Sequence, residues 1–267
     1  MWHGMRPLPA PVWGFPCVWK KHVTRWEAQL MDYNGVLVGL GNPGARYEGT
    51  RHNCGFALVD ALVDFGRRHG VVDEMNGGKF ACQLWRVRLP RLGGSWLAAK
   101  PQTFMNLSGQ CVQPLLAWHK LKPQDLVVAH DELDISPGEL RFKFGGGNAG
   151  HNGLKSITEL LGTPDFYRLR MGIGRPPHKG DVTNWVLGRP QGEDAENLER
   201  SLPTALDVLF TFAEKGLDSA VRTAGKTARP RKPVSKPVSK PDSTTAGDEA
   251  RPGSPETSAC AQKQDKM

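Results

Sequence analysis

The sequence has few cysteines, and they are not arranged in pairs. Its 267 residues include five, at positions 17, 54, 82, 111 and 260, and none of them forms a CxxC motif. An odd number of unpaired cysteines argues against a disulfide framework and a thiolate zinc site, and it indicates a reducing compartment. No run approaches the roughly 18 consecutive apolar residues of a membrane span. The composition therefore argues against disulfide-stapled secreted proteins and membrane-spanning proteins, and we expect a cytoplasmic location.

The two ends of the sequence are expected to lie outside the folded domain. Residues 1–30 contain no continuous apolar segment of the kind that marks a secretory signal. We expect a disordered N-terminal extension or a mis-assigned start there. Residues 222–267 are rich in Pro, Ser and Lys, so they cannot bury enough apolar surface to offset their ordering entropy. We expect a disordered basic tail there and one folded domain over residues 31–221.

The net charge of +8 comes from these two ends. Residues 222–267 hold ten Lys/Arg and five Asp/Glu, a net charge of +5, and residues 1–30 hold four and one, a net charge of +3. Residues 31–221 are therefore close to neutral, so any contact with a polyanion there requires a local basic patch. The tail either adds nonspecific attraction to RNA or is an inert solvated linker.

Short apolar segments alternate with helical periods through the central part of the chain. Strands are predicted at residues 36–40, 80–89, 96–99, 126–129 and 167–173, and helices near residues 55–65, 105–118, 156–161 and 195–215. This alternation predicts a single-domain α/β sandwich with a mixed, mostly parallel central sheet flanked by helices. In such a fold, the functional loops lie at the carboxyl ends of the strands.

The first predicted strand ends in a glycine-rich motif, Val36–Gly44, whose glycines follow the G-x-G-x-x-G spacing of dinucleotide-binding proteins. Pro43 has no N–H to offer a pyrophosphate, and no helical period begins before about Gly55. The motif therefore favours a loop that presents Asn42 and, further on, Arg51–Asn53. It predicts no dinucleotide cofactor.

His52 and Asp131 are the candidate catalytic pair. An imidazole titrates near neutral pH and can take a proton from water. Asp131 follows a predicted buried strand, and its carboxylate could accept the other imidazole N–H, as the acid does in hydrolase triads. Glu132 and Asp134 are neighbouring alternatives, and any of the three could instead only cap the following turn.

No nucleophile accompanies this pair. The sequence has no G-x-S-x-G motif, and Cys54 stands where a helix begins and is expected to pack as a small apolar residue. No group of His and carboxylate residues has metal-ligand spacing, so we predict direct attack by water without metal or cofactor. Asn42, Asn106 and Asn152 are neutral amides that could hold a carbonyl, a ribose hydroxyl or an oxyanion, although Asn is also common in turns.

Six short motifs follow one another along the predicted domain. They are Val38–Gly44, Thr50–Asn53, Thr103–Gly109, Val128–Asp134, Gly145–Leu154 and Arg168–Gly174. In this order they resemble the bacterial peptidyl-tRNA hydrolase family over roughly residues 36–217. The chain departs from that family at Asn148-Ala149, where His-Gly is frequent.

The resemblance implies hydrolysis of the ester between the peptide and the 3′ ribose of peptidyl-tRNA, with His52 as general base and Asp131 supporting it. It assigns Asn42 to distinguishing blocked from free aminoacyl ends. It places Tyr47, Phe104, Asn106 and Asn152 along the tRNA-end and peptide channel, and Lys143 and Arg170 at tRNA phosphates. The last two could instead be solvated strand charges.

The resemblance implies peptidyl-tRNA as the partner, and we expect a monomer. Two other interpretations fit the sequence less well. A dinucleotide-binding oxidoreductase would require the glycine motif to open a helix, and a non-catalytic RNA-binding relative would be expected to lack His52 or Asp131.

Overall fold

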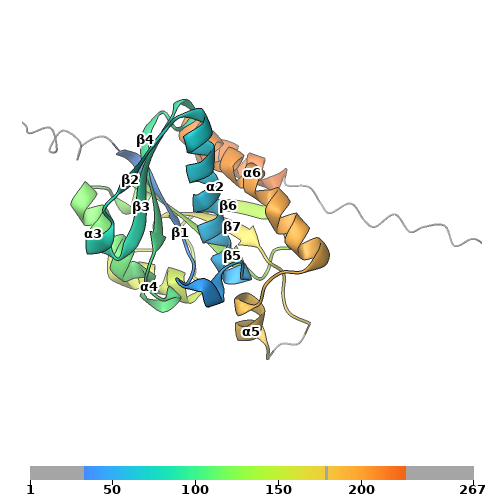
Figure 1. Cartoon of the computed structure of the whole chain (residues 1–267). Helices are drawn as coiled ribbons and strands as arrows, with labels where there is room; N and C mark the ends of the chain where they lie inside the picture. The colour runs from blue at the N-terminus through green and yellow to red at the C-terminus, as the bar shows by residue number, and fades with distance from the viewer. Residues whose placement is uncertain (1–32, 178–179, 227–267) are drawn as a thin grey trace, which may run out of the picture. The chain divides into compact units, whose positions relative to one another are not determined.

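The protein is built on one mixed seven-stranded sheet. The structure, a computed structural model, describes residues 33–177 and 180–226 (Figure 1). The strands are β1 (Tyr33–Gly39), β2 (Val71–Met75), β3 (Cys82–Leu89), β4 (Gly94–Pro101), β5 (Leu126–Glu132), β6 (Leu140–Phe144) and β7 (Tyr167–Gly172). Their spatial order is β2-β3-β4-β1-β5-β7-β6.

The centre of the sheet is parallel and its edges are antiparallel. β1 pairs in parallel with β4 on one side and β5 on the other, and β5 pairs in parallel with β7. β2 and β3 on one side, and β6 on the other, are joined by antiparallel pairs. This arrangement confirms the predicted mixed α/β sheet. Because β1, β5 and β7 run in the same direction, the loops that follow them meet at one edge.

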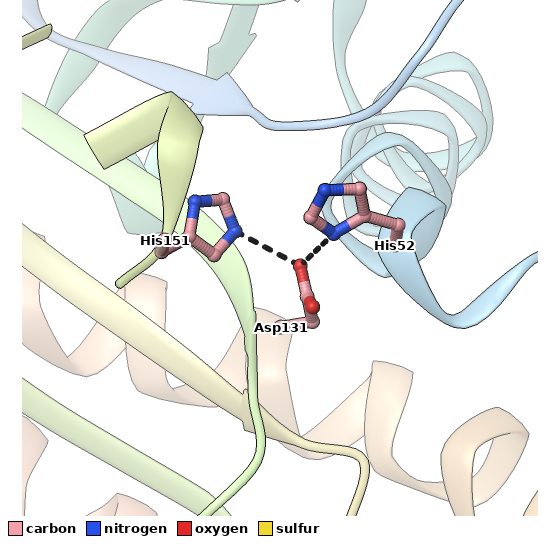
Figure 2. Close-up of side chains that lie close together, drawn as sticks. All are labelled: His52, Asp131 and His151. Carbon is pink, nitrogen blue, oxygen red and sulfur yellow. Dashed lines mark hydrogen bonds and ion pairs between the residues drawn. The ribbon is translucent and has the colours of Figure 1, made fainter. Parts of the chain in front are cut away.

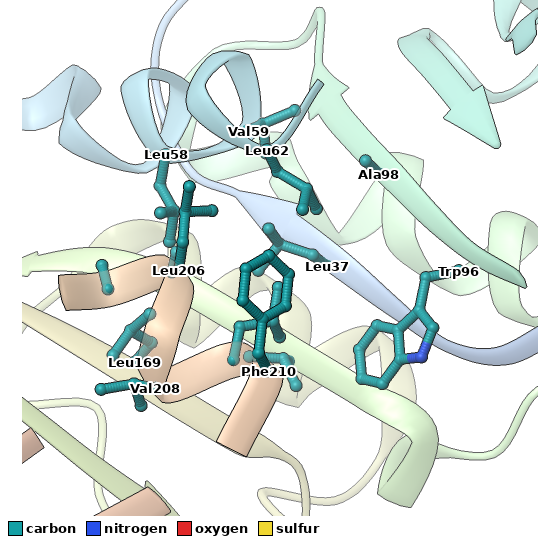
Figure 3. Close-up of a cluster of buried hydrophobic side chains, with 14 of the residues drawn as sticks. Leu37, Leu58, Val59, Leu62, Trp96, Ala98, Leu169, Leu206, Val208 and Phe210 are labelled. Atoms are coloured by element: carbon teal, nitrogen blue, oxygen red, sulfur yellow. The ribbon is translucent and has the colours of Figure 1, made fainter. Parts of the chain in front are cut away.

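Helices cover both faces of the sheet. They are α2 (Cys54–His69), α3 (Ser108–His119), α4 (Asn152–Leu161), α5 (Val182–Leu187), α6 (Gly192–Lys215) and α7 (Leu217–Gly225). α2, α6 and α7 contribute to one buried apolar cluster, and α3 and α4 contribute to another. β1 shows the alternation that separates the two clusters, since Leu37 belongs to the first and Val36 and Val38 belong to the second. Figure 3 shows Leu37 between the side chains of α2 and Phe210 of α6.

The predicted elements lie where the periodicity places them, but four others were not predicted. β2 and β6 are short strands with partly exposed side chains, and α5 and α7 are short helices. α7 ends at Gly225 and buries Ala224, so the fold continues past the expected boundary at residue 221. Residues 1–30 and 227–267, on which the predicted extension and most of the predicted tail fall, lie outside the described residues. Within the described ranges, no helix is both long and apolar enough to cross a membrane.

The glycine motif at the end of β1 serves the packing of α2. A Cβ added to Gly39 would lie 2.1 Å from the carbonyl oxygen of Gly55, and one added to Gly55 would lie 2.4 Å from the nitrogen of Leu40. Such distances are far below van der Waals contact, so only glycine at both positions lets the helix approach the strand this closely. The helix therefore starts against the end of β1, and the short 3-10 helix before it, Arg51–Asn53, lies at the carboxyl edge of the sheet.

Candidate active site

A cleft of about 700 Å³ lies beside the ends of β1 and β5. The residues that the sequence predicts as catalytic or substrate-binding all line it: Asn42, Tyr47, His52, Phe104, Asn106, Asp131 and Asn152. The remaining lining includes His151 and four residues of α5. Residues from distant parts of the chain thus share one cleft, although their individual roles stay predictions at this point.

His52 and Asp131 are joined by a hydrogen bond inside this cleft. His52 Nδ1 lies 2.8 Å from Asp131 Oδ1 (Figure 2). Asp131 is the penultimate residue of β5 and is 4% exposed, and His52 lies in the 3-10 helix that precedes α2. When Nδ1–H donates to the carboxylate, a neutral imidazole carries its lone pair on Nε2. Figure 2 shows Nε2 turned away from Asp131, where it can accept a proton.

The other two acids of the same segment have different partners. Glu132 Oε2 accepts from Arg170 Nε at 2.9 Å, and Asp134 Oδ1 accepts from Arg175 Nε at 2.6 Å. Asp131 is therefore the acid of this segment that contacts His52.

His151 is a third member of the cluster, and the sequence reasoning missed it. Its Nε2 lies 3.0 Å from Asp131 Oδ1, the same oxygen that binds His52 (Figure 2). Its Nδ1 accepts from the backbone N–H groups of Gly153 and Leu154 and so caps the start of α4. An acceptor at Nδ1 places the proton on Nε2, which donates to the carboxylate. The only sequence signal is a His-Asn pair that closes a glycine-rich segment.

The carboxylate of Asp131 stays ionised because of these two imidazoles. Burial alone would raise its pKa, but His151 and His52, through charge and hydrogen bonding, outweigh burial and hold the pKa well below its usual range. A charged acceptor here can stabilise a positive charge that develops on His52.

The same three side chains also form a possible metal-binding group. Ligand atoms of His52, Asp131 and His151 lie within 4.8 Å of one another. The sequence showed no metal-ligand spacing, because these residues come from three separate segments. Their 2.8 and 3.0 Å contacts form a donor–acceptor–donor chain that accounts for the geometry through hydrogen bonds.

Asn42 is held in place by its neighbours. Its backbone N–H donates to Asn53 Oδ1 at 2.9 Å, and its carbonyl accepts from Asn53 Nδ2 at 3.0 Å. Its own Oδ1 accepts from the backbone N–H of Met105 at 2.8 Å. The side chain of Asn42 therefore offers its Nδ2 donors to the cleft.

The other predicted substrate-binding residues lie at more open positions. Tyr47 is half-buried, whereas Phe104, Asn106 and Asn152 are exposed. Phe104 is 57% exposed, so its ring is accessible from the cleft that it lines.

Lys143 and Arg170 do not line the cleft. They lie on β6 and β7, and Arg170 is paired with Glu132 at 2.9 Å. Burial and the nearby guanidinium groups of Arg170 and Arg168 lower the pKa of Lys143. The predicted contact of Lys143 and Arg170 with phosphates stays a prediction.

Cys54 packs as the sequence predicts. It is the first residue of α2, is buried and belongs to the apolar cluster under that helix. Burial raises the pKa of its thiol well above the usual value, so it is a poor nucleophile.

His130 is a buried residue that packs against His151. It is 2% exposed, its Nδ1 lies 2.7 Å from the carbonyl oxygen of Asp131, and its ring meets the ring of His151 edge-on at 5.1 Å. Its Nε2 has no hydrogen-bond partner among the described residues. Burial and the nearby His151 lower the pKa of His130 to about 3, so it stays neutral at physiological pH.

Comparisons with known proteins point to one family. The family model described as peptidyl-tRNA hydrolase matches residues 36–232. A Desulfovibrio desulfuricans protein named peptidyl-tRNA hydrolase is 83% identical over 235 residues, which cover 88% of this chain and 99% of that protein. A Nitratidesulfovibrio vulgaris protein of the same name is 54% identical, with 73% and 97% covered. The crystal structure of peptidyl-tRNA hydrolase from Acinetobacter baumannii matches with a TM-score of 0.66 and 36% identity, over 73% of this chain and 95% of that one.

Replacing His130 should reduce the loss of stability in acid. Its folded-state pKa of about 3 lies below the ordinary value of 6.5, so only the unfolded chain takes up the proton as the pH falls between these values. The stability that the neutral, buried ring of His130 contributes above pH 6.5 is therefore lost as the pH falls toward 3. Between pH 7 and pH 5, the free energy of unfolding of the wild type should fall by about 1–2 kcal/mol more than that of His130→Leu. Urea denaturation at both pH values measures this difference, and equal falls would contradict it.

Proposed function

The chain belongs to the peptidyl-tRNA hydrolase family, and we propose that it hydrolyses the ester between the peptide and the 3′ ribose of tRNA with His52 as general base. Hydrolysis of this ester releases free tRNA for reuse in translation. The observation that carries the proposal is the hydrogen-bonded chain His52–Asp131–His151, whose free end faces the cleft.

The geometry supports direct attack by water. His52 Nε2 takes a proton from a water molecule as the water oxygen bonds to the ester carbon. Asp131 Oδ1 stabilises the imidazolium that forms, and His151 keeps that oxygen in position. The carbon–oxygen bond to the ribose then breaks, and the Nε2 proton passes to the ribose oxygen. No enzyme nucleophile is needed.

Asn42 is suited to sensing the blocked amino group. Its Oδ1 is occupied by the N–H of Met105, so its Nδ2 can donate to a carbonyl oxygen. A peptidyl or acetyl group brings such a carbonyl, whereas a free aminoacyl ester brings an ammonium group that is itself a donor. Asn42 therefore favours the blocked substrate.

The remaining predicted residues serve the two ends of the substrate. We assign Tyr47, Phe104, Asn106 and Asn152 to the channel for the tRNA end and the peptide, because they line the same cleft as His52. We assign Lys143 and Arg170 to tRNA phosphates outside it. Because the domain is nearly neutral overall, binding of a polyanion such as tRNA requires a local basic patch, and these two residues would supply it.

The two rival interpretations have less support. A dinucleotide site needs the glycine motif to open directly into a helix, whereas α2 begins only at Cys54, well after Gly44. A non-catalytic relative would be expected to lack His52 or Asp131, and both are present. We further propose that the protein acts in the cytoplasm, where tRNA is recycled, and that it acts as a monomer.

His52→Ala should abolish most of the activity. Without the base, hydrolysis of N-acetyl-aminoacyl-tRNA should slow by about 10²-fold or more, and the wild type should leave free aminoacyl-tRNA intact. Release of radiolabelled amino acid measures both. The matched control is His69→Ala, which removes an exposed imidazole at the far end of α2 and should leave the rate unchanged. Equal rates for wild type and His52→Ala would overturn the assignment.

The catalytic domain, by our proposal, extends from about residue 31 through α7, and the basic tail follows it. Deleting residues 227–267 should leave turnover intact and flatten the salt dependence of tRNA binding, since the deletion removes cations that contact phosphates. Binding measured by filter retention at several salt concentrations gives the slope. An unchanged slope would identify the tail as an inert linker.

A further inference from the structure

Arg51 is a buried cation beside the proposed catalytic base. It is 7% exposed, it precedes His52 directly, and it does not line the cleft that holds His52. Nothing in the proposed reaction uses it. Burying a guanidinium is unfavourable unless its contacts compensate for lost hydration, so its partners reveal its role.

Among the described residues, the partners of the Arg51 guanidinium and the acceptor of its backbone N–H belong to the segment from α5 to the start of α6. Its guanidinium carbon lies 3.8 Å from the ring centroid of Trp185. Its Nη1 donates to the carbonyl of Arg189 at 3.2 Å, and its backbone N–H donates to the carbonyl of Gly188 at 3.0 Å. Its Nη2 also lies 3.6 Å from Asp194 Oδ2. Arg51 thus contacts this segment through its charge, through the face of its guanidinium group and through its backbone N–H.

α5 has little else to hold it. None of its six residues is buried, and its main packing partner is the 3-10 helix Arg51–Asn53. Trp185 is anchored on its other side by a hydrogen bond from Nε1 to the carbonyl of Gly174 at 2.9 Å. Figure 1 shows α5 away from the sheet.

The same helix forms one wall of the cleft. Val182, Val186 and Leu187 of α5 line the cleft together with His52. The contact of Arg51 with Trp185 therefore fixes the distance between this apolar wall and the catalytic histidine.

We propose that Arg51 is a positioning residue that holds α5 as a wall of the substrate cleft beside His52. The inference rests on the proposed hydrolysis of peptidyl-tRNA and assigns a determinant of substrate binding to that same cleft. Only a planar cation can stack on Trp185 and donate to the backbone at the same time, so lysine is not an adequate substitute.

Kinetics of three variants test this role. Arg51→Lys and Trp185→Leu should each raise KM for N-acetyl-aminoacyl-tRNA by about tenfold and change kcat by less than about threefold, because the wall is displaced while His52 keeps Asp131. The double variant should raise KM no further than the stronger single variant, since both changes break one contact. The matched control is Arg91→Lys, whose guanidinium carbon lies 4.7 Å from the ring of Phe210 on α6, and it should leave KM unchanged.

A second measurement does not depend on activity. In protein labelled with 5-fluorotryptophan, the ¹⁹F resonance of Trp185 is assigned by its loss in Trp185→Leu. Arg51→Lys should move this resonance toward its solvent-exposed position, and Arg91→Lys should not. An unmoved resonance would overturn the inference whether or not the wild type is active. Inactivity of the wild type would by itself refute only the proposed function.

Other kinetic results would also overturn it. These are wild-type KM values in both single variants, additive effects in the double variant, or a loss of kcat at constant KM. A loss of kcat at constant KM would mean that Arg51 acts on the turn that carries His52 and not on α5.

Discussion

One carboxylate oxygen organises the site. Asp131 Oδ1 accepts a hydrogen bond from His52 and another from His151, so a single buried atom joins the end of β5, the turn before α2 and the start of α4. Because the carboxylate is ionised and buried, each lost donor would leave it poorly compensated. The same bonds orient His52 so that Nε2 faces the cleft. Structure and proposed chemistry therefore depend on the same contact.

The fold brings these segments together through close backbone approaches. Gly39 and Gly55 let α2 begin against the end of β1, which brings His52 to the carboxyl edge of β5. The amide of Asn53 then binds both backbone groups of Asn42, so the loop after β1 and the turn before α2 form one unit. Arg51 extends this unit to α5 and to the residues that follow it. Arg51, His52 and Asn53, three consecutive residues of one short turn, thus contact different neighbours.

The sequence predicts the central fold because burial imposes regular periods. β1 and β5 are continuous apolar runs, and α2 repeats apolar residues at helical spacing, so their positions follow from the pattern. β2 and β6 escape prediction because edge strands are partly exposed and carry mixed side chains. α5 escapes because none of its residues is buried and it depends on tertiary contacts with Arg51. The boundary at residue 221 falls short because the small residues of α7 give a weak apolar signal, although Ala224 is buried.

Part of the candidate site was predictable because it lies at the ends of strands that the sequence pattern reveals. His52 and Asp131 follow predicted strands or a glycine-rich turn, and strand direction alone places them at one edge. His151 and Arg51 could not be found that way, because no pattern along the chain indicates which residues the fold brings against them. No spacing rule along the chain reveals that His151 and His52 share one oxygen.

The tautomer of His52 tests this account most directly. Long-range ¹H–¹⁵N NMR of the imidazole nitrogens, assigned with His52→Gln, distinguishes a protonated from a bare ring nitrogen. The account predicts that neutral His52 carries its proton on Nδ1, hydrogen-bonded to Asp131, and leaves Nε2 bare. A proton on Nε2 in the neutral ring would contradict it, since that nitrogen could not then take a proton from water.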